Sequence, residues 1–190
     1  MFTGHLRRPI SLNDHGLSKG KIFGVVAVLV TLLVAAVTQT NMQFGKLVES
    51  IELSESQMYE MFDELEQATD DLVELEGISD SQRLAYFRED VARISGKYER
   101  KIATTGKAIR GILLLPWNSS HRNLKTAYLR HNDAWVEHLA ERSQNPTLRQ
   151  STPIETSWEQ FCFQAAKSSP VLAFGRYDTR FTQICTKGSN

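Results

Sequence analysis

The sequence lacks an excess of either charge, because its 22 basic and 22 acidic residues cancel. Proteins that coat nucleic acid are usually strongly basic, so this balance argues against a nucleic-acid partner. The chain also lacks a phosphate-binding glycine loop, a nucleophile elbow, a zinc-protease motif and a dinucleotide fingerprint. These absences favour a protein that is not an enzyme and that holds no cofactor.

Cysteine is scarce as well. Cys162 and Cys185 are the only two, and they form no CxxC redox pair. A metal site would need more ligands at close spacing, so no metal is predicted. In an oxidising compartment the two thiols would form a disulfide, which would stabilise the fold by about 3 kcal/mol in the chain-entropy model. The alternative is two separate buried thiols.

One long apolar run is present near the start. Residues 22–37 are apolar apart from Gly24 and Thr31. As a helix this run covers roughly 24 Å, and its flanks extend it toward the ~30 Å of a bilayer's hydrocarbon core. Four basic residues precede it, and positive charge resists translocation. We therefore predict a cytoplasmic basic tail (1–21), a transmembrane anchor (22–38) and a C-terminal part outside the cytoplasm. Those basic residues are Arg7, Arg8, Lys19 and Lys21.

A cleaved signal peptide is the alternative to the anchor. Val34, Ala35 and Ala36 fit a small-residue cleavage site, although a signal ending there would be longer than usual. Both interpretations place the main domain outside the cytoplasm, in the periplasm, at the cell surface or in a lumen.

A heptad pattern follows the apolar run. Over residues 42–76, nine of ten seam positions are apolar, which predicts a helix roughly 50 Å long. The seam positions are Phe44, Leu47, Ile51, Ser54, Met58, Met61, Leu65, Ala68, Leu72 and Leu75. Such a seam packs within a bundle, or it pairs two chains, so a homodimer through residues 42–76 is one prediction for the partner.

A second helix is predicted to return along the first. Gly77 ends the first helix, and Ser79 with Gln82 forms a capping box for the second. The inner face runs from Leu84 to Leu113, and Pro116 ends the helix. With such a short connection, residues 39–115 should form a long antiparallel hairpin.

Residues 116–190 are predicted to add helices closed by the disulfide. Asn118 or Ser119 caps a third helix to about residue 143, and Thr152 with Pro153 begins a fourth that ends near residue 169. The last twenty residues form either a short helix or a coil. The fold class is therefore all-α, with an N-terminal single transmembrane helix followed by a long antiparallel hairpin within a four- to five-helix extracytoplasmic bundle.

The third helix carries an aromatic and histidine stripe, Tyr128, His131, Trp135 and His138. The two histidines lie about 10 Å apart along the helix, too far to share one ion without ligands from elsewhere. Hydrogen-bonded, partly buried histidines are the first interpretation. A pH-sensing pair is the second, because imidazole titrates near neutrality. Metal binding or catalysis is the third.

Charge is unevenly distributed along the chain. Residues 49–76 contain eleven acidic side chains and no basic one, whereas residues 83–149 contain thirteen basic and six acidic. Pairing between an acidic and a basic helix explains this pattern, and an acidic surface reserved for a partner is the alternative.

Two functions follow from these features. The first is a membrane-anchored, non-enzymatic interaction or scaffold protein, an accessory subunit of a membrane or envelope complex with a protein partner. The second is a ligand-sensing or ligand-binding domain with an aromatic pocket between helices.

Overall fold

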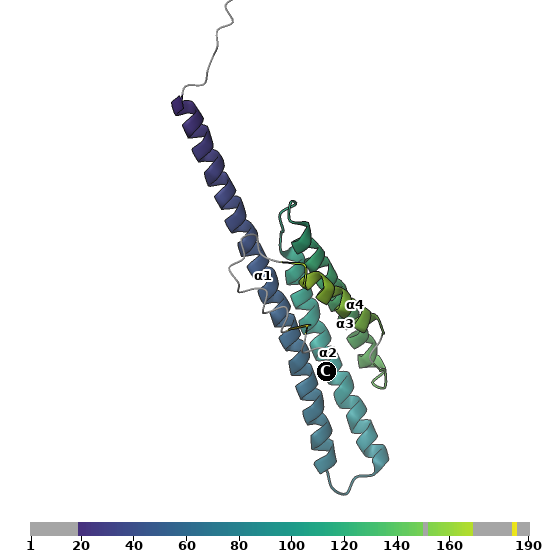
Figure 1. Ribbon diagram of the computed structural model, residues 1–190. Coiled ribbons are helices and arrows are strands. Elements are labelled where there is room, and N and C mark those ends of the chain that lie inside the picture. The colour runs from purple at the N-terminus through teal and green to yellow at the C-terminus, as the bar shows by residue number, and fades with distance from the viewer. Residues whose placement is uncertain (1–18, 150–151, 169–183, 186–190) are drawn as a thin grey trace, which may run out of the picture. The chain divides into compact units, whose positions relative to one another are not determined.

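The computed structural model describes residues 19–149, 152–168 and 184–185, and over this part the protein is all-helical, with four helices and no strand. The helices are α1 (Lys19–Glu74), α2 (Asp80–Gly111), α3 (Ser119–Gln144) and α4 (Thr152–Ala165) (Figure 1). The predicted basic tail and most of the last twenty residues lie outside the described residues.

The apolar run lies in the first part of α1. Its best 18-residue window has a mean hydropathy of 2.2, and its large side chains are between 52% and 80% exposed from Phe23 to Val34. Exposing this much apolar surface to water is unfavourable by roughly 25 cal/mol per Å². The segment is therefore a candidate membrane-spanning helix, as predicted.

Contacts divide the chain into two units, Met1–Val37 and Thr38–Asn190. In the second unit the heptad seam is used within the chain, because seven of its ten positions are buried. Five of the seven belong to two apolar clusters, and each cluster contains residues from all four helices. The first is Phe44, Leu47, Val48, Ile51, Ile109, Leu124, Ala127, Tyr128, Phe161 and Ala165. The second is Met58, Met61, Ile94, Tyr98, Ile102, Trp135, Leu139 and Ile154.

Polar contacts fix how α1 and α2 pair. Glu64 binds Lys97 and Arg93, and Gln57 accepts a hydrogen bond from Thr105 at 3.0 Å. Lys101 pairs with Glu60 in between, so the contacts run in opposite order along the two helices. The acidic run of α1 thus pairs in part with basic residues of α2.

The connection between these helices is built as predicted. Gly77 has a positive φ of 79°, which glycine adopts without strain. Ser79 caps α2, and the reciprocal hydrogen bonds with Gln82 complete the capping box. The guanidinium of Arg83 donates to the carbonyls of Leu72 and Leu75, at 2.7 and 2.6 Å, which satisfies groups that the end of α1 leaves without a helical partner.

Two helix ends differ from the predictions. The second helix ends at Gly111, before Pro116, because Lys125 donates to the carbonyls of Arg110 and Ile112 in place of a further turn. Leu84 and Leu113, predicted on the inner face, are exposed.

The fourth helix ends at Ala165 rather than near residue 169. A turn of Ala166, Lys167 and Ser168 follows it, with Ser168 N donating to Ala165 O at 3.1 Å. The Ser168 hydroxyl donates to the carbonyls of Gln164 and Ser120, and this contact joins the end of α4 to the start of α3.

Candidate functional site

A layer of buried polar side chains lies between the two apolar clusters. The Tyr128 hydroxyl donates to Glu55 Oε1 at 2.8 Å, and the Asn132 amide donates to Ser54 Oγ at 3.3 Å and to the Ile102 carbonyl at 3.2 Å. We call Ser54, Glu55, Tyr128, His131, Asn132 and Ser157 the polar layer. Ser54 is the one polar position of the heptad seam, and this layer explains why it is polar.

Glu55 is the acidic group of this layer. Its side chain is only 7% exposed, and burial raises the pKa of its carboxyl to about 7, although the hydrogen bond from Tyr128 acts in the opposite direction. Burial, with the charge of Glu55 adding to it, holds the pKa of Tyr128 well above its ordinary value. The group of this layer that titrates near neutrality is therefore a carboxyl.

His131 belongs to a chain of hydrogen bonds. The Trp135 indole N–H donates to His131 Nε2 at 3.1 Å, and an indole can only donate, so Nε2 is the acceptor. His131 Nδ1 then carries the proton and faces Ser157 Oγ at 3.1 Å, and Ser157 in turn donates to the Ile154 carbonyl. Burial lowers the pKa of His131 to about 4, so the ring is neutral at physiological pH.

His138 completes the predicted stripe. It is buried beside the Trp135 ring, with centroids 6.0 Å apart, and burial followed by the nearby charge of Arg142 lowers its pKa. The stripe of Tyr128, His131, Trp135 and His138 thus faces the interior of the bundle. Ligand binding or pH sensing by these four residues stays a prediction.

Two surface grooves lie elsewhere. One, of about 440 Å³, runs between α3 and α4 and is lined by Asn123, Thr126, Ala127, Arg130, Gln160, Phe163 and Gln164. The other, of about 350 Å³, lies where α1 ends and α2 begins. Neither groove is lined by a residue of the predicted stripe. Over the described ranges no three His, Cys, Asp or Glu side chains gather closely enough to hold a metal ion.

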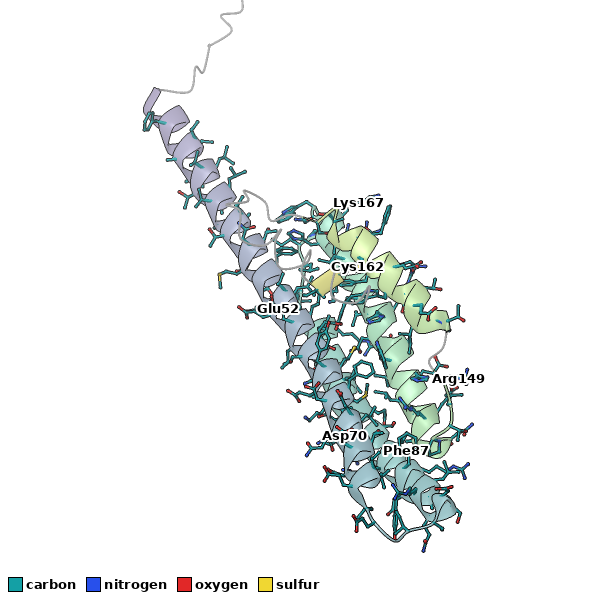
Figure 2. The ribbon with its side chains drawn as sticks, turned by 60° about the horizontal axis from the view of Figure 1, so that its bottom comes forward. Glu52, Asp70, Phe87, Arg149, Cys162 and Lys167 are labelled. Carbon is teal, nitrogen blue, oxygen red and sulfur yellow. A yellow bond between two sulfur atoms is a disulfide. The ribbon has the colours of Figure 1, made fainter. Side chains whose placement is uncertain are left out.

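The second groove belongs to a surface that we call the two-helix tip, residues 64–93. In Figure 1 this part of α1 and α2 extends beyond the ends of α3 and α4, and Figure 2 labels Asp70 and Phe87 on it. Its exposed apolar side chains are Val73, Leu75, Leu84 and Tyr86. The groove is lined by Ala68, Asp71, Leu72, Leu75, Ile78, Tyr86 and Asp90. The two-helix tip therefore exposes apolar side chains that are surrounded by carboxylates.

Cys162 of α4 and Cys185 lie at disulfide distance, with 5.7 Å between their Cα atoms (Figure 2). Ile184 and Cys185 pack against the first apolar cluster. The bond therefore ties the end of the chain to the core, and it indicates folding in an oxidising compartment.

Asn118 begins a glycosylation acceptor pattern with Ser119 and Ser120. Its side chain is buried and caps α3, accepting from the backbone N–H of His121 at 3.2 Å. The geometry therefore assigns Asn118 a capping role in the folded domain.

These features define a class: a helical domain joined to an apolar helix long enough to cross a membrane. No family model, curated protein or solved structure matches the chain. The function must therefore be argued from the geometry.

Proposed function

We propose that this chain is a single-pass membrane protein whose helical domain lies outside the cytoplasm and binds a protein partner through the two-helix tip. It acts as a non-enzymatic scaffold or as an accessory subunit of a membrane or envelope complex. The observation that carries the proposal is the tip itself, where Val73, Leu75, Leu84 and Tyr86 are exposed beyond the four-helix part of the domain.

The interior of the domain supports the same proposal. Tyr128, His131 and Trp135 of the predicted stripe are buried and hydrogen-bonded inside the domain, as in the Tyr128–Glu55 and Trp135–His131 contacts. The seam of α1 is also covered by the chain's own helices. A partner must then bind an outer surface, and the tip combines apolar area with acidic residues.

The chemistry of the tip indicates what binds it. Burying Tyr86 and Val73 would favour an apolar partner surface, and the neighbouring Asp71 and Asp90 would favour basic residues around it. Tyrosine is among the residues that dominate binding energy at interfaces. We therefore expect a partner with an apolar centre and a basic rim.

The proposed orientation follows from charge and from cysteine. The basic residues before the apolar segment favour a cytoplasmic N-terminus, and the Cys162–Cys185 pair favours an oxidising compartment for the domain. In this arrangement α1 and α2 form the predicted antiparallel hairpin, and the two-helix tip lies at its closed end. A tag at Asn190 tests the orientation, because protease should digest it from outside sealed cells or spheroplasts. Digestion only after lysis of the inner compartment would contradict it.

A photo-crosslinking residue tests the binding surface. Placed at Tyr86, it should give one discrete crosslinked product in intact cells. Placed at the exposed Gln160 of α4, in the groove between α3 and α4, it should give none. Adding Val73→Asp should abolish the Tyr86 product because it places a charge in the apolar patch. A product of twice the chain mass would identify the partner as a second copy, and equal products at both positions would contradict the proposal.

The second candidate, a ligand-binding domain, rests on the groove between α3 and α4. Its volume of about 440 Å³ and its polar lining, with Arg130 among the residues, suit a small anionic or hydrogen-bonding molecule. Thermal melting against a metabolite panel tests it. A stabilising compound whose effect Arg130→Ala removes would support this function.

A further inference from the structure

The connection between α2 and α3 exposes two large apolar side chains. Leu113 is 81% exposed and Trp117 is 64% exposed, whereas their neighbours Ile112 and Leu114 pack against the first apolar cluster. The loop thus divides its apolar residues between the core and the outside.

Hydrogen bonds hold the loop in this conformation. Lys125 Nζ donates to the carbonyls of Arg110 and Ile112 at 2.8 and 2.7 Å, and Asn118 N donates to the Leu115 carbonyl at 3.2 Å. These bonds therefore hold the loop backbone in the conformation that leaves Leu113 and Trp117 exposed.

The loop lies at the same end of the second unit as Thr38, the first residue of that unit. The His121 ring, just after the loop, stacks on Phe44 of α1 at 3.9 Å between centroids. Phe44 is six residues from Thr38, or about 9 Å along the helix. The covalent connection therefore keeps this end close to the last residue of the anchor.

The end of α4 lies next to the start of α3, at this same end of the second unit. Ser168 donates to the Ser120 carbonyl at 3.2 Å, which brings exposed Phe163 and Lys167 to this end. Lys167 Nζ lies 3.6 Å from the centre of the Phe163 ring. Figure 2 labels Lys167 at the far end of α4 from the two-helix tip.

Charge distinguishes this end from the tip. Residues 38–48, 111–125 and 160–168 contain four basic residues and no acidic one, whereas residues 63–90 contain ten acidic and two basic. The four basic residues are Lys46, Arg122, Lys125 and Lys167. An anionic surface is thus favoured at this end.

We propose that this end binds the headgroup layer of the bilayer that holds the anchor, with Leu113 and Trp117 inserted at the boundary with the acyl chains. The inference rests on the proposed membrane anchor. Tryptophan is enriched at that depth, because its ring is apolar and its N–H reaches a polar partner. The headgroup layer extends roughly 5 to 8 Å beyond the hydrocarbon core on each side, which is close to the distance of about 9 Å between Phe44 and Thr38. Lys46, Arg122 and Lys167 bind lipid phosphates beside the loop.

The proposal is tested with the full chain in liposomes of phosphatidylcholine and phosphatidylglycerol that contain lipids brominated near the top of the acyl chain. Bromine quenches tryptophan at short range; Trp135 is buried in the bundle and Trp158 is partly buried against the first apolar cluster. Quenching should be strong in the natural chain and absent in Trp117→Phe. A chain that floats with the liposomes but shows no Trp117 quenching overturns the inference and leaves the anchor intact.

A second measurement does not depend on Trp117. Leu113→Cys labelled with an environment-sensitive fluorophore should emit as in an apolar medium in the same liposomes, and labelled Leu84→Cys, an exposed leucine of the tip, should emit as in water. Equal emission at both sites overturns the inference. A chain that does not float at all overturns it together with the proposed anchor.

Discussion

The hydroxyl group of Tyr128 donates a hydrogen bond to the carboxyl group of Glu55 across 2.8 Å, and both side chains are buried beside the two apolar clusters. The contact joins α1 to α3. It gives α1 an ionisable group with a pKa near neutrality next to Ser54, the one polar position of the heptad seam. Protonation of this group therefore affects the stability of the bundle.

The first prediction concerns Glu55→Gln. The folded-state pKa of about 7 lies above the ordinary 4.5, so the carboxyl's contribution to stability is fully present below pH 4.5 and is lost as pH rises through 7. Glutamine does not titrate and still accepts from Tyr128. The variant should therefore gain about 2 to 3 kcal/mol over the natural chain between pH 5 and pH 8. Denaturant unfolding in detergent at both pH values measures this, and Glu49→Gln, an exposed acid of α1, is the control. A difference that does not change with pH would contradict the raised pKa.

The second prediction has the opposite sign. The folded-state pKa of His131, about 4, lies below the ordinary 6.5, so its contribution is present above pH 6.5 and is lost as pH falls toward 4. His131→Gln removes this titration and keeps an acceptor for Trp135. We expect the variant to be less stable by about 1 to 3 kcal/mol at pH 7, because the hydrogen-bond chain to Ser157 is disturbed. The deficit should shrink as pH is lowered to 5. A constant deficit would mean that His131 does not titrate differently in the two states.

The third prediction compares two glycines of α2. A Cβ at Gly106 would lie 3.0 Å from Asn132 Cγ and closer still to Oδ1, in the packed polar layer. Gly106→Ala should therefore destabilise the protein by about 1 to 3 kcal/mol. A Cβ at Gly96 would lie 3.9 Å from Ser143 Cβ, an ordinary contact, so Gly96→Ala should be neutral or stabilising by up to about 1 kcal/mol. Thermal unfolding of both variants measures the difference, and equal effects would show that Asn132 moves aside.

Local patterns made most of the fold predictable. A capping box at Ser79, an Asn cap at residue 118 and the glycine at residue 77 act within a few residues, so their chemistry can be recognised without knowing what packs around them. The heptad seam likewise predicted which side of α1 is buried. The extra length predicted for the second helix was wrong, because Lys125, 15 residues further along the chain, donates to the Arg110 carbonyl at the end of α2.

The polar layer was harder to predict. Glu55 is one of eleven acidic residues between positions 49 and 76, and nothing local separates it from those that face solvent. Ser54 was the available signal, because it alone interrupts the apolar seam. Its meaning required Asn132, which lies 78 residues away and reaches it only once α3 has packed against α1. Contacts of this kind depend on tertiary structure.

The last prediction concerns Cys162 and Cys185, which are separated by 23 residues in the sequence. Closing a loop of this length should stabilise the fold by about 3 kcal/mol, because it restricts the unfolded chain. Replacing both cysteines by alanine should lower the free energy of unfolding by about that amount. Reducing agent should have the same effect on the natural chain and none on the double variant. Since Ile184 packs on the first apolar cluster beside Cys185, exchange of backbone amides in α4 should also become faster. Unfolding curves that are unchanged by reduction would show that the bond does not contribute, and the argument for an oxidising compartment would lose its support.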